Sequence, residues 1–375
     1  MRFLHLSDLH LGKRVNEFSM LEDQAYILKE ILNIIDEQKV EAVLIAGDVY
    51  DKVIPPAEAV RLLDDFLTRL AARELPVFLI SGNHDSAERV AFGSRLMSSR
   101  QIYLSPVFES DVEPITISDR YGEINIYMLP FVKPSLVKRV YPEEEVITYQ
   151  DAVNAAVQHM QIDTDKRNIL LAHQFVTGAA RCDSEELSVG GVDDVDAAVF
   201  EGFDYVALGH LHGAQYVSRP KIRYCGTLLK YSVSESTQTK SLTVVTLKEK
   251  GEKPEIACYP LHPLRDVRKK KGTLEEIIKE AGEEEKEDYI SITLTDEIDP
   301  YKPKEQLERV FSHILEIRVD NQRTRTKLKE MDEELVMKDP FTSFCEFYKE
   351  MQGREMNTQE ETIMKEIFDN VKGVE

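Results

Sequence analysis

The sequence predicts an α/β fold in which two β-sheets pack as a sandwich with helices on the outer faces. Continuous apolar runs within residues 1–7, 41–47 and 76–82 alternate with two segments of helical periodicity. Apolar strands that alternate with helices are typical of a largely parallel, buried sheet. The chain has 375 residues, which is enough for roughly two or three domains.

The helices are predicted from the spacing of their apolar residues. Residues 19–38 place Ile27, Ile31 and Ile35 on one face, and residues 57–73 and 149–161 show the same kind of spacing. A further helix is expected at residues 305–315. The remaining strands are expected in apolar runs at residues 101–108, 113–118, 124–130, 168–176, 204–213, 222–235, 240–247 and 289–296.

A change of composition near Leu261 divides the chain into three predicted parts. Residues 1–261 form the core domain, residues 262–335 a small α+β cap domain, and residues 336–375 a helical tail. The tail carries apolar side chains at helical spacing, which either pack back on the core or dock on a partner. They are Phe341, Phe344, Phe347 and Ile367.

The charge of the chain limits how it can bind a polyanion. The net charge is −21, and both residues 1–260 and residues 261–375 contain more acidic than basic side chains. If the protein holds DNA, the attraction must come from local basic residues, bound cations or a partner.

The sequence also bears on the compartment. No run approaches the roughly 20 apolar residues that span a bilayer, and the first strand lacks the features of a signal peptide. The four cysteines are scattered without metal-binding spacing. We therefore expect a cytoplasmic protein that does not bind a membrane.

Five of the predicted strands end in polar side chains that can bind a metal ion. Strands in such sheets place their carboxyl ends at one edge, where ligands collect. Each polar end alone has a structural explanation, such as a turn or a packed histidine, but burying them all unpaired would cost several kcal/mol. The side chains are Asp8 and His10, Asp48, Asn83 with His84, His173, and His210 with His212. Asp8 and His10 are two residues apart, so alternation along the strand predicts that they point the same way.

Oxygen and nitrogen ligands without thiolates favour manganese, iron or zinc, and more ligands are present than one ion needs. We therefore expect two ions about 3.5–4 Å apart that share a carboxylate. Asp48 is the best candidate for this bridge.

The order of these motifs resembles the calcineurin-like metallophosphoesterases. The motifs are DLH at 8–10, GDVYD at 47–51, GNHD at 82–85, AHQ around His173 and GHLH at 209–212. Within that superfamily the chain is similar to the SbcD family, the nuclease subunits of bacterial SbcCD complexes. The similarity extends to GDVYDKVIPP, YCGTLLKYSVSES, PLRDVRKKKG and FTSFCEFYKEMQG, and so covers nearly the whole chain.

The resemblance implies a role for each residue of the motifs. Asp8, His10, Asp48 and His212 would bind one Mn²⁺, and Asp48, Asn83, His173 and His210 the second, with Mg²⁺, Fe²⁺ or Zn²⁺ as possible substitutes. His84 would face the scissile phosphate and stabilise the transition state or protonate the leaving oxygen, and Asp85 would orient it. Archaeal and eukaryotic relatives have a histidine three residues after the bridging aspartate, where this chain has Asp51.

The resemblance also implies the substrate and partners. It implies a Mn²⁺-dependent double-strand exonuclease and single-strand or hairpin endonuclease, acting in DNA repair, recombination and replication near the nucleoid. The tail would bind the coiled coil of an SbcC-type ATPase, in a heterotetramer built on a homodimer.

Several basic residues are candidates for DNA contact. Lys13 and Arg14 follow the first metal motif and either grip a phosphate or are simply exposed after a turn. The basic run that includes Arg268, Lys269 and Lys270 is either a solvated face or a contact to phosphate.

Two other functions fit the same motifs. One is a metallophosphoesterase that acts on small phosphodiesters or nucleotides, and the other is a non-catalytic scaffold on the same fold. Because all seven ligand positions and His84 are filled, we favour an enzyme over the scaffold.

Overall fold

The computed structural model describes residues 1–180, 194–298, 300–324 and 340–372, and the chain divides into two compact units. The larger unit comprises residues 1–270, 281–292 and 308–316, and the smaller unit comprises residues 271–280, 293–307 and 317–375. The three-part division given above stays a prediction, and its boundary at residues 335 and 336 lies outside the described residues.

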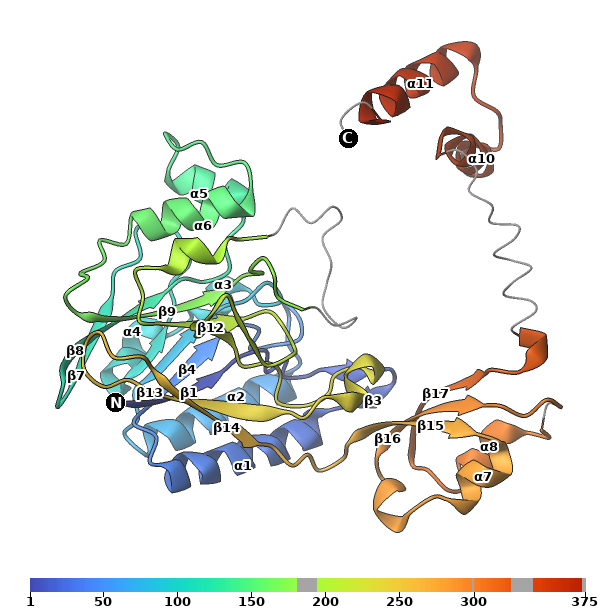
Figure 1. Cartoon of the computed structure of the whole chain (residues 1–375), viewed down its shortest axis with the longest axis horizontal. Helices are drawn as coiled ribbons and strands as arrows, with labels where there is room; N and C mark the ends of the chain where they lie inside the picture. Colours follow the sequence, from blue (N-terminus) through green and yellow to red (C-terminus); the bar gives the residue numbers. More distant parts are fainter. Residues whose placement is uncertain (181–193, 299, 325–339, 373–375) are drawn as a thin grey trace. The chain divides into compact units, whose positions relative to one another are not determined.

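Two six-stranded sheets form the centre of the larger unit (Figure 1). The first sheet contains, in spatial order, β14 (Glu255–Pro260), β13 (Ser241–Thr246), β1 (Arg2–Leu6), β4 (Ala42–Ala46), β5 (Val77–Ile80) and β6 (Ile102–Leu104). The second contains β11 (Gln215–Val217), β12 (Arg219–Tyr224), β10 (Tyr205–Gly209), β9 (Arg167–His173), β8 (Gly122–Met128) and β7 (Ile115–Asp119). Strands β1, β4, β5 and β6 run parallel, as do β8, β9, β10 and β12.

The two sheets pack face to face through a fully buried apolar layer. Phe3, Leu44 and Phe78 of the first sheet belong to the same buried cluster as Ile126 and Leu171 of the second. Because strands of this kind are buried on both faces, they read in the sequence as continuous apolar runs.

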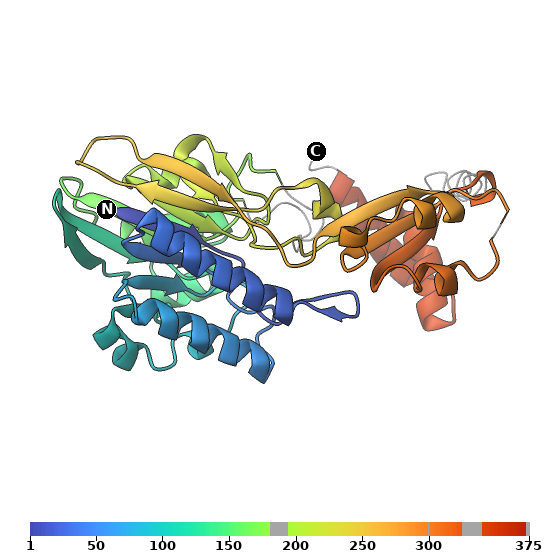
Figure 2. The same cartoon turned by 90° about the horizontal axis from the view of Figure 1, so that it is seen from below.

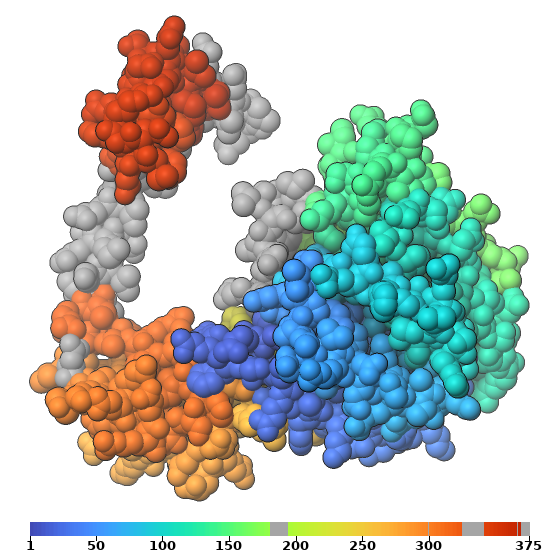
Figure 3. Space-filling model, turned by 180° about the vertical axis from the view of Figure 1, so that it is seen from behind, coloured from blue at the N-terminus to red at the C-terminus, as the bar shows by residue number. Residues whose placement is uncertain are grey.

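Helices cover the outer face of each sheet, which confirms the predicted sandwich. Helices α1 (Leu21–Gln38) and α2 (Ala57–Ala71) lie side by side on one face, and α5 (Pro134–Val140) and α6 (Tyr149–Gln158) lie on the other (Figures 1 and 2). From behind, the first hundred residues form a continuous surface of the larger unit (Figure 3).

The short helical segments lie in the connections. They are α3 (Ala87–Val90), α4 (Ser94–Met97), η1 (Ser98–Arg100), η2 (Ala197–Phe200), η3 (Val233–Thr237) and η4 (Glu283–Glu285), and β2 (Arg14–Val15) pairs with β3 (Phe18–Ser19) in a small hairpin. None of the described helices combines the length and the apolar character that crossing a bilayer requires.

The C-terminal third contains a three-stranded sheet and corrects one predicted helix. The sheet has the order β15 (Val267–Gly272), β16 (Tyr289–Leu294) and β17 (His313–Val319). The helix predicted at residues 305–315 is wrong, because α8 (Pro303–Leu307) ends early and β17 follows. The segment HILEIRV alternates apolar and polar residues, and pairing with β16 decides its conformation in favour of a strand.

The remaining helices belong to the smaller unit. They are α7 (Leu274–Lys279), α10 (Pro340–Gln352) and α11 (Thr358–Lys372). Helices α10 and α11 pack on each other through aromatic rings, since Phe368 lies 5.9 Å from Phe341 and 5.8 Å from Phe344, measured between ring centroids.

Candidate metal centre

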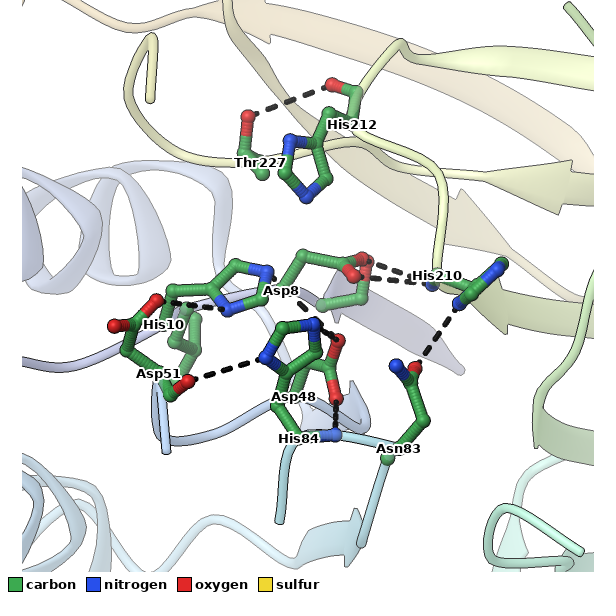
Figure 4. A network of polar contacts seen from close by, with 12 residues as sticks. Asp8, His10, Asp48, Asp51, Asn83, His84, His210, His212 and Thr227 are labelled. Carbon is green, nitrogen blue, oxygen red and sulfur yellow. Dashed lines mark hydrogen bonds and ion pairs between the residues drawn. The ribbon is translucent and has the colours of Figure 1, made fainter. Parts of the chain in front are cut away.

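The carboxyl ends of strands from both sheets meet at one edge of the sandwich, and the candidate ligands lie there (Figure 4). Strands β1, β4 and β5 of the first sheet lead into Asp8, Asp48 and Asn83. Strands β9 and β10 of the second sheet lead to His173 and His210.

The loops that carry the ligands have an unusual backbone conformation. The φ angles are 53° at Asp8, 44° at His10, 49° at Asp48 and 103° at His210. Residues other than glycine rarely adopt positive φ, and such strain persists only where the surrounding structure enforces it. The ligand loops are therefore held in place by the fold around them.

This conformation corrects one detail of the sequence-based expectation. Alternation along a strand was the reason to expect Asp8 and His10 to face the same way, yet β1 ends at Leu6. Hydrogen bonds instead fix the loop, since the amide of Asp8 donates to the carbonyl of Gly47 (3.0 Å) and that of His10 to the carbonyl of Asp48 (2.9 Å).

Glycines allow the strand ends to approach each other closely. A Cβ atom on Gly209 would lie 1.9 Å from the carbonyl oxygen of Ala46 and 2.6 Å from Nδ1 of His173. A Cβ on Gly82 would lie 2.1 Å from Oδ1 of Asp48. Neither position has room for a side chain, so glycine is required for the two sheets to meet here.

Three imidazole rings converge on the carboxylate of Asp48. Its Oδ2 lies 3.3 Å from Nε2 of His173, 3.8 Å from Nε2 of His10 and 4.0 Å from Nε2 of His84. Asp48 is nearly fully buried. A carboxylate at the centre of the cluster has the position that a bridging ligand requires.

Asn83 and Asp8 connect the remaining ligands. Oδ1 of Asn83 lies 2.9 Å from Nε2 of His173 and 3.0 Å from Nδ1 of His210. The backbone amide of His210 donates to both carboxylate oxygens of Asp8 at 3.1 and 3.2 Å. These contacts bring side chains of the two sheets within reach of common ions.

The pKa values of the two buried carboxylates, Asp8 and Asp48, are shifted in opposite directions. Burial raises the pKa of Asp8 to about 6, although His173 opposes the shift. Burial also disfavours the charge of Asp48, but the combined attraction of His173, His10 and His84 outweighs it and holds the pKa of Asp48 well below its usual range.

The pKa values of the histidines are also shifted in different directions. Burial lowers the pKa of His10 well below its usual value and lowers the pKa of His210 to about 3. Burial opposes the charge of His173, but Asp48 raises its pKa to about 9. His10 and His210 are therefore neutral at physiological pH, which is the form that ligates metals.

The residues present fit a metal centre. Both ring nitrogens of His10 are buried without a hydrogen-bond partner among the described residues. Three groups of side chains place one ligand atom each within 4.8 Å of one another: Asp8, His10 and His212; His10, Asp48 and His84; and Asp8, Asp48 and His173. Orphaned imidazole nitrogens beside buried carboxylates are costly unless a cation satisfies them.

His84 stands at the edge of this cluster and is partly exposed. Its Nδ1 lies 3.1 Å from the backbone carbonyl of Asp51, and its amide donates to Oδ1 of Asp48 at 3.0 Å. The carbonyl of Asp51 can only accept a hydrogen bond, so Nδ1 donates it, and Nε2 lies 4.0 Å from Oδ2 of Asp48. The side chain of Asp51 lies 2.8 Å from Nζ of Lys13.

The carboxylate of Asp85 accepts hydrogen bonds from three backbone amides. They belong to Val49 (3.0 Å), Tyr50 (2.9 Å) and Gly82 (2.9 Å). Asp85 thereby joins the loop that contains Asp48 to the loop of residues 82–85. Its expected role in orienting His84 stays a prediction.

Sequence reasoning missed one partner of the centre, Glu235. Its Oε1 lies 3.3 Å from Nδ1 of His212, and the residue is fully buried. The only signal was its position in the segment YCGTLLKYSVSES, since nothing in the local pattern distinguishes it from a surface glutamate.

The basic residues expected to contact DNA are mostly paired with protein groups. Lys13 pairs with Asp51, and Arg14 donates to the carbonyl of Glu17. Arg268 pairs with Asp288 at 2.6 Å and Lys270 with Glu285 at 2.6 Å. Lys269 is exposed, and no ion pair joins it to the residues that the structure describes.

The apolar residues of the tail fall into two sets. Phe341 and Phe344 contact Phe368 within the helical pair. Phe347 and Ile367 are 57% and 48% exposed. The packing of α10 on α11 therefore leaves the side chains of Phe347 and Ile367 uncovered.

The comparisons with known proteins agree with the fold and the motifs. A model of the calcineurin-like phosphoesterases matches residues 1–214, and a model of the type 5 capsule protein repressor C-terminal domain matches residues 260–352. The chain is 32% identical over 378 residues to the SbcD subunit of the nuclease SbcCD of Staphylococcus epidermidis, covering 98% of each chain. It is 31% identical over 373 residues to the protein of the same name from Staphylococcus saprophyticus, again covering 98% of each chain.

A crystal structure of a dimetal phosphatase from Danio rerio covers 69% of this chain and 99% of its own, with 14% identity and a TM-score of 0.41. This distant likeness adds nothing to the assignment.

The sandwich and the match over residues 1–214 define a hydrolase of phosphoester bonds with the dimetal centre that this class implies. Within the class, the chain belongs to the SbcD family of nuclease subunits, because its relatives align over nearly its whole length.

Proposed function

We propose that this chain is the Mn²⁺-dependent nuclease subunit of an SbcCD-type complex. It would hydrolyse DNA phosphodiester bonds as an exonuclease on double-stranded ends and as an endonuclease on single strands and hairpins. Membership of the family and the convergence of His10, His84 and His173 on Asp48 support this proposal.

The ligands would divide between two ions that share Asp48. Asp8, His10 and His212 would hold one, and Asn83, His173 and His210 the other. Two divalent ions held by these residues would supply Lewis acidity toward the phosphate and toward a water. Manganese suits this mixed set of carboxylate, amide and imidazole donors.

His84 would move the proton in this reaction. With Nδ1 held by the carbonyl of Asp51, Nε2 is the atom available to donate to the leaving oxygen. The backbone hydrogen bond from His84 to Asp48 keeps the ring beside the reacting phosphate.

Because the chain is acidic, it needs a partner to hold DNA. The net charge is −21, and four of the basic residues expected to contact DNA already bind protein groups. We propose that an SbcC-type ATPase, bound through the exposed apolar residues of α10 and α11, shares the DNA with this subunit. DNA held by two proteins does not depend on the field of one of them.

We further propose a homodimer, formed through apolar side chains near α3 and α4. Phe92 is 84% exposed and Leu96 is 81% exposed. Neighbouring large apolar side chains that are this exposed are typical of a protein interface. Sedimentation of the wild type and Phe92→Ser tests this, with a dimer for the wild type and a monomer for the variant expected.

The decisive experiment is a nuclease assay with Mn²⁺ on hairpin and linear DNA, comparing the wild type with His84→Gln. We expect the variant to keep its metal and lose cleavage. Wild-type cleavage by the variant would contradict the assignment of His84. Hydrolysis of bis-p-nitrophenyl phosphate without cleavage of either DNA would instead favour a phosphodiesterase of small substrates.

A further inference from the structure

Glu235 contacts one of the two ring nitrogens of His212. It belongs to η3 and is 0% exposed. Its Oε1 lies 3.3 Å from Nδ1 of His212. Because a buried carboxylate accepts hydrogen bonds and an imidazole nitrogen can donate one, this contact selects the tautomer with the proton on Nδ1.

The side chain of Lys240 fixes the carboxylate of Glu235. Nζ of Lys240 donates to Oε2 at 2.6 Å, and the hydroxyl oxygen of Thr227, whose proton has a shorter acceptor in the carbonyl of Leu229 at 2.8 Å, lies 3.3 Å from the same oxygen. Lys240 is itself 7% exposed. A buried negative charge is costly without a partner, and Lys240 provides the compensating charge.

The same segment also holds the backbone of His212. The carbonyl oxygen of His212 accepts hydrogen bonds from the amide of Thr227 at 3.1 Å and from Nζ of Lys240 at 3.0 Å. Residues 227–240 therefore fix both the main chain and the ring of His212. Little freedom remains for the ring to rotate away.

The consequence concerns the opposite ring nitrogen. With Nδ1 donating to Glu235, Nε2 is the unprotonated ring nitrogen, which carries the lone pair that can ligate a cation. Asp8, His10 and His212 form one of the groups whose ligand atoms approach within 4.8 Å.

His173, a ligand of the other proposed ion site, has a different hydrogen-bond partner behind its ring. Nδ1 of His173 lies 2.8 Å from the backbone carbonyl of Ala46, a neutral acceptor. A carboxylate behind an imidazole makes the ring a stronger ligand than a carbonyl does.

We propose that Glu235, held by Lys240, is a positioning residue that fixes the Nδ1-protonated tautomer of His212 and tightens the ion site of Asp8, His10 and His212. The inference rests on the proposed dimetal centre and adds a residue to it that none of the motifs contains.

Titration of the metal-free full chain with Mn²⁺, followed by electron paramagnetic resonance and calorimetry, tests the proposal. For Glu235→Gln we expect affinity at one of the two sites to fall by about 10- to 100-fold, with the other within about twofold of the wild type. The matched control is Asp23→Asn, which also removes a fully buried carboxylate, one that binds Arg265 and Tyr289. It should leave both affinities unchanged.

Equal affinities in Glu235→Gln and the wild type would overturn the proposal, while a wild type that binds fewer than two ions would overturn the dimetal centre itself. A ¹⁵N spectrum of the histidine side chains in the wild type gives an answer even if the variant does not fold. We expect His212 to carry its proton on Nδ1, and a proton on Nε2 would refute the role of Glu235.

Discussion

Nε2 of His173 lies 3.3 Å from Oδ2 of Asp48, while its Nδ1 lies 2.8 Å from the carbonyl oxygen of Ala46. His173 ends a strand of the second sheet, and Ala46 ends a strand of the first, with Asp48 two residues beyond it. One ring thus joins the two sheets at the candidate metal centre. The geometry of the centre depends on how the sheets pack.

Replacing the proposed bridging carboxylate should remove the metal and the activity. For Asp48→Asn we expect loss of bound Mn²⁺ and a fall in phosphodiester hydrolysis of at least about a hundredfold, because the neutral amide cannot bridge two cations. Elemental analysis and hydrolysis of bis-p-nitrophenyl phosphate measure both effects. Asp65→Asn is the control, since Asp65 is exposed and, within the part of the chain that the structure describes, pairs only with Arg69 on the same helix. Full metal content in Asp48→Asn would exclude the bridge.

Mn²⁺ should stabilise the folded protein. At a free concentration of about 100 times the Kd, one bound ion raises the free energy of unfolding by about 2.7 kcal/mol. The stabilisation is expected because the ion satisfies His10, whose ring nitrogens have no partner among the described residues. Denaturant unfolding with Mn²⁺ and with a chelator measures it. An equal effect on Asp48→Asn would place the ion elsewhere.

The glycine at the end of β10 should not tolerate a side chain. A Cβ on Gly209 would meet the carbonyl of Ala46 at 1.9 Å and the ring of His173 at 2.6 Å. We expect Gly209→Ala to lower the free energy of unfolding by at least about 2 kcal/mol and to weaken metal binding. Gly202→Ala is the matched control, because its Cβ would meet only the flexible end of Ile162 at 3.4 Å. Similar stabilities of the two variants would contradict this reading of the strand ends.

A buried ion pair far from the centre should make stability depend on pH. Burial disfavours the charge of Asp119, but hydrogen bonds from Arg167 hold its pKa well below the usual range. Arg167 is 2% exposed, so Asp119→Asn leaves its charge uncompensated and should cost about 3 kcal/mol at neutral pH.

The sign of the pH effect follows from the depressed pKa. The folded protein takes up the proton less readily than the unfolded chain, so the stabilisation is complete above about pH 4 and decreases as the pH falls below it. Denaturant unfolding between about pH 3 and 7, a range that spans the pKa of the unfolded carboxyl, measures the effect. The difference in free energy of unfolding between the wild type and Asp119→Asn should become smaller toward the acid end. A difference that is constant with pH would mean that Asp119 is not paired as a charge.

The tail should be needed for the partner and not for the chemistry. Deleting residues 339–375 should abolish co-purification with an SbcC-type ATPase while phosphodiesterase activity remains. Phe347→Ser should weaken the same interaction, because Phe347 is 57% exposed and Phe341 and Phe344 instead pack within the pair. Gln359→Ala, an exposed polar position on α11, is the control. Unchanged co-purification of the deletion would refute the docking role.

The sequence predicted much of the fold because its strands are buried on both faces and therefore read as unbroken apolar runs. The same runs predicted where Asp8, Asp48, Asn83, His173 and His210 lie, since each stands at the end of a strand or within three residues after it. The positive φ angles at Asp8, His10, Asp48 and His210 were not predictable, because hydrogen bonds between loops that are distant in the sequence hold these positions. Alternation along β1 was therefore the wrong reason for a correct proximity.

Contacts between distant side chains were also beyond the sequence. Lys13 pairs with Asp51 because the neighbouring strands β1 and β4 bring their loops together, and Glu235 contacts His212, 23 residues away in the sequence. The helix predicted at residues 305–315 overlaps only the start of β17, whose apolar spacing fits both periods, and pairing with β16 decides in favour of the strand.

The order of strands in the first sheet has a consequence for synthesis of the protein. Strand β1, which leads into Asp8, pairs on one side with β4 and on the other with β13, where Arg2 lies opposite Thr246. While the ribosome makes the chain from its N-terminus, one edge of β1 stays open until residues 241–246 emerge. An open edge strand invites pairing with other chains, so the nascent protein is most prone to aggregate before β13 is made, and nonsense truncations upstream of Ser241 should accumulate as insoluble fragments.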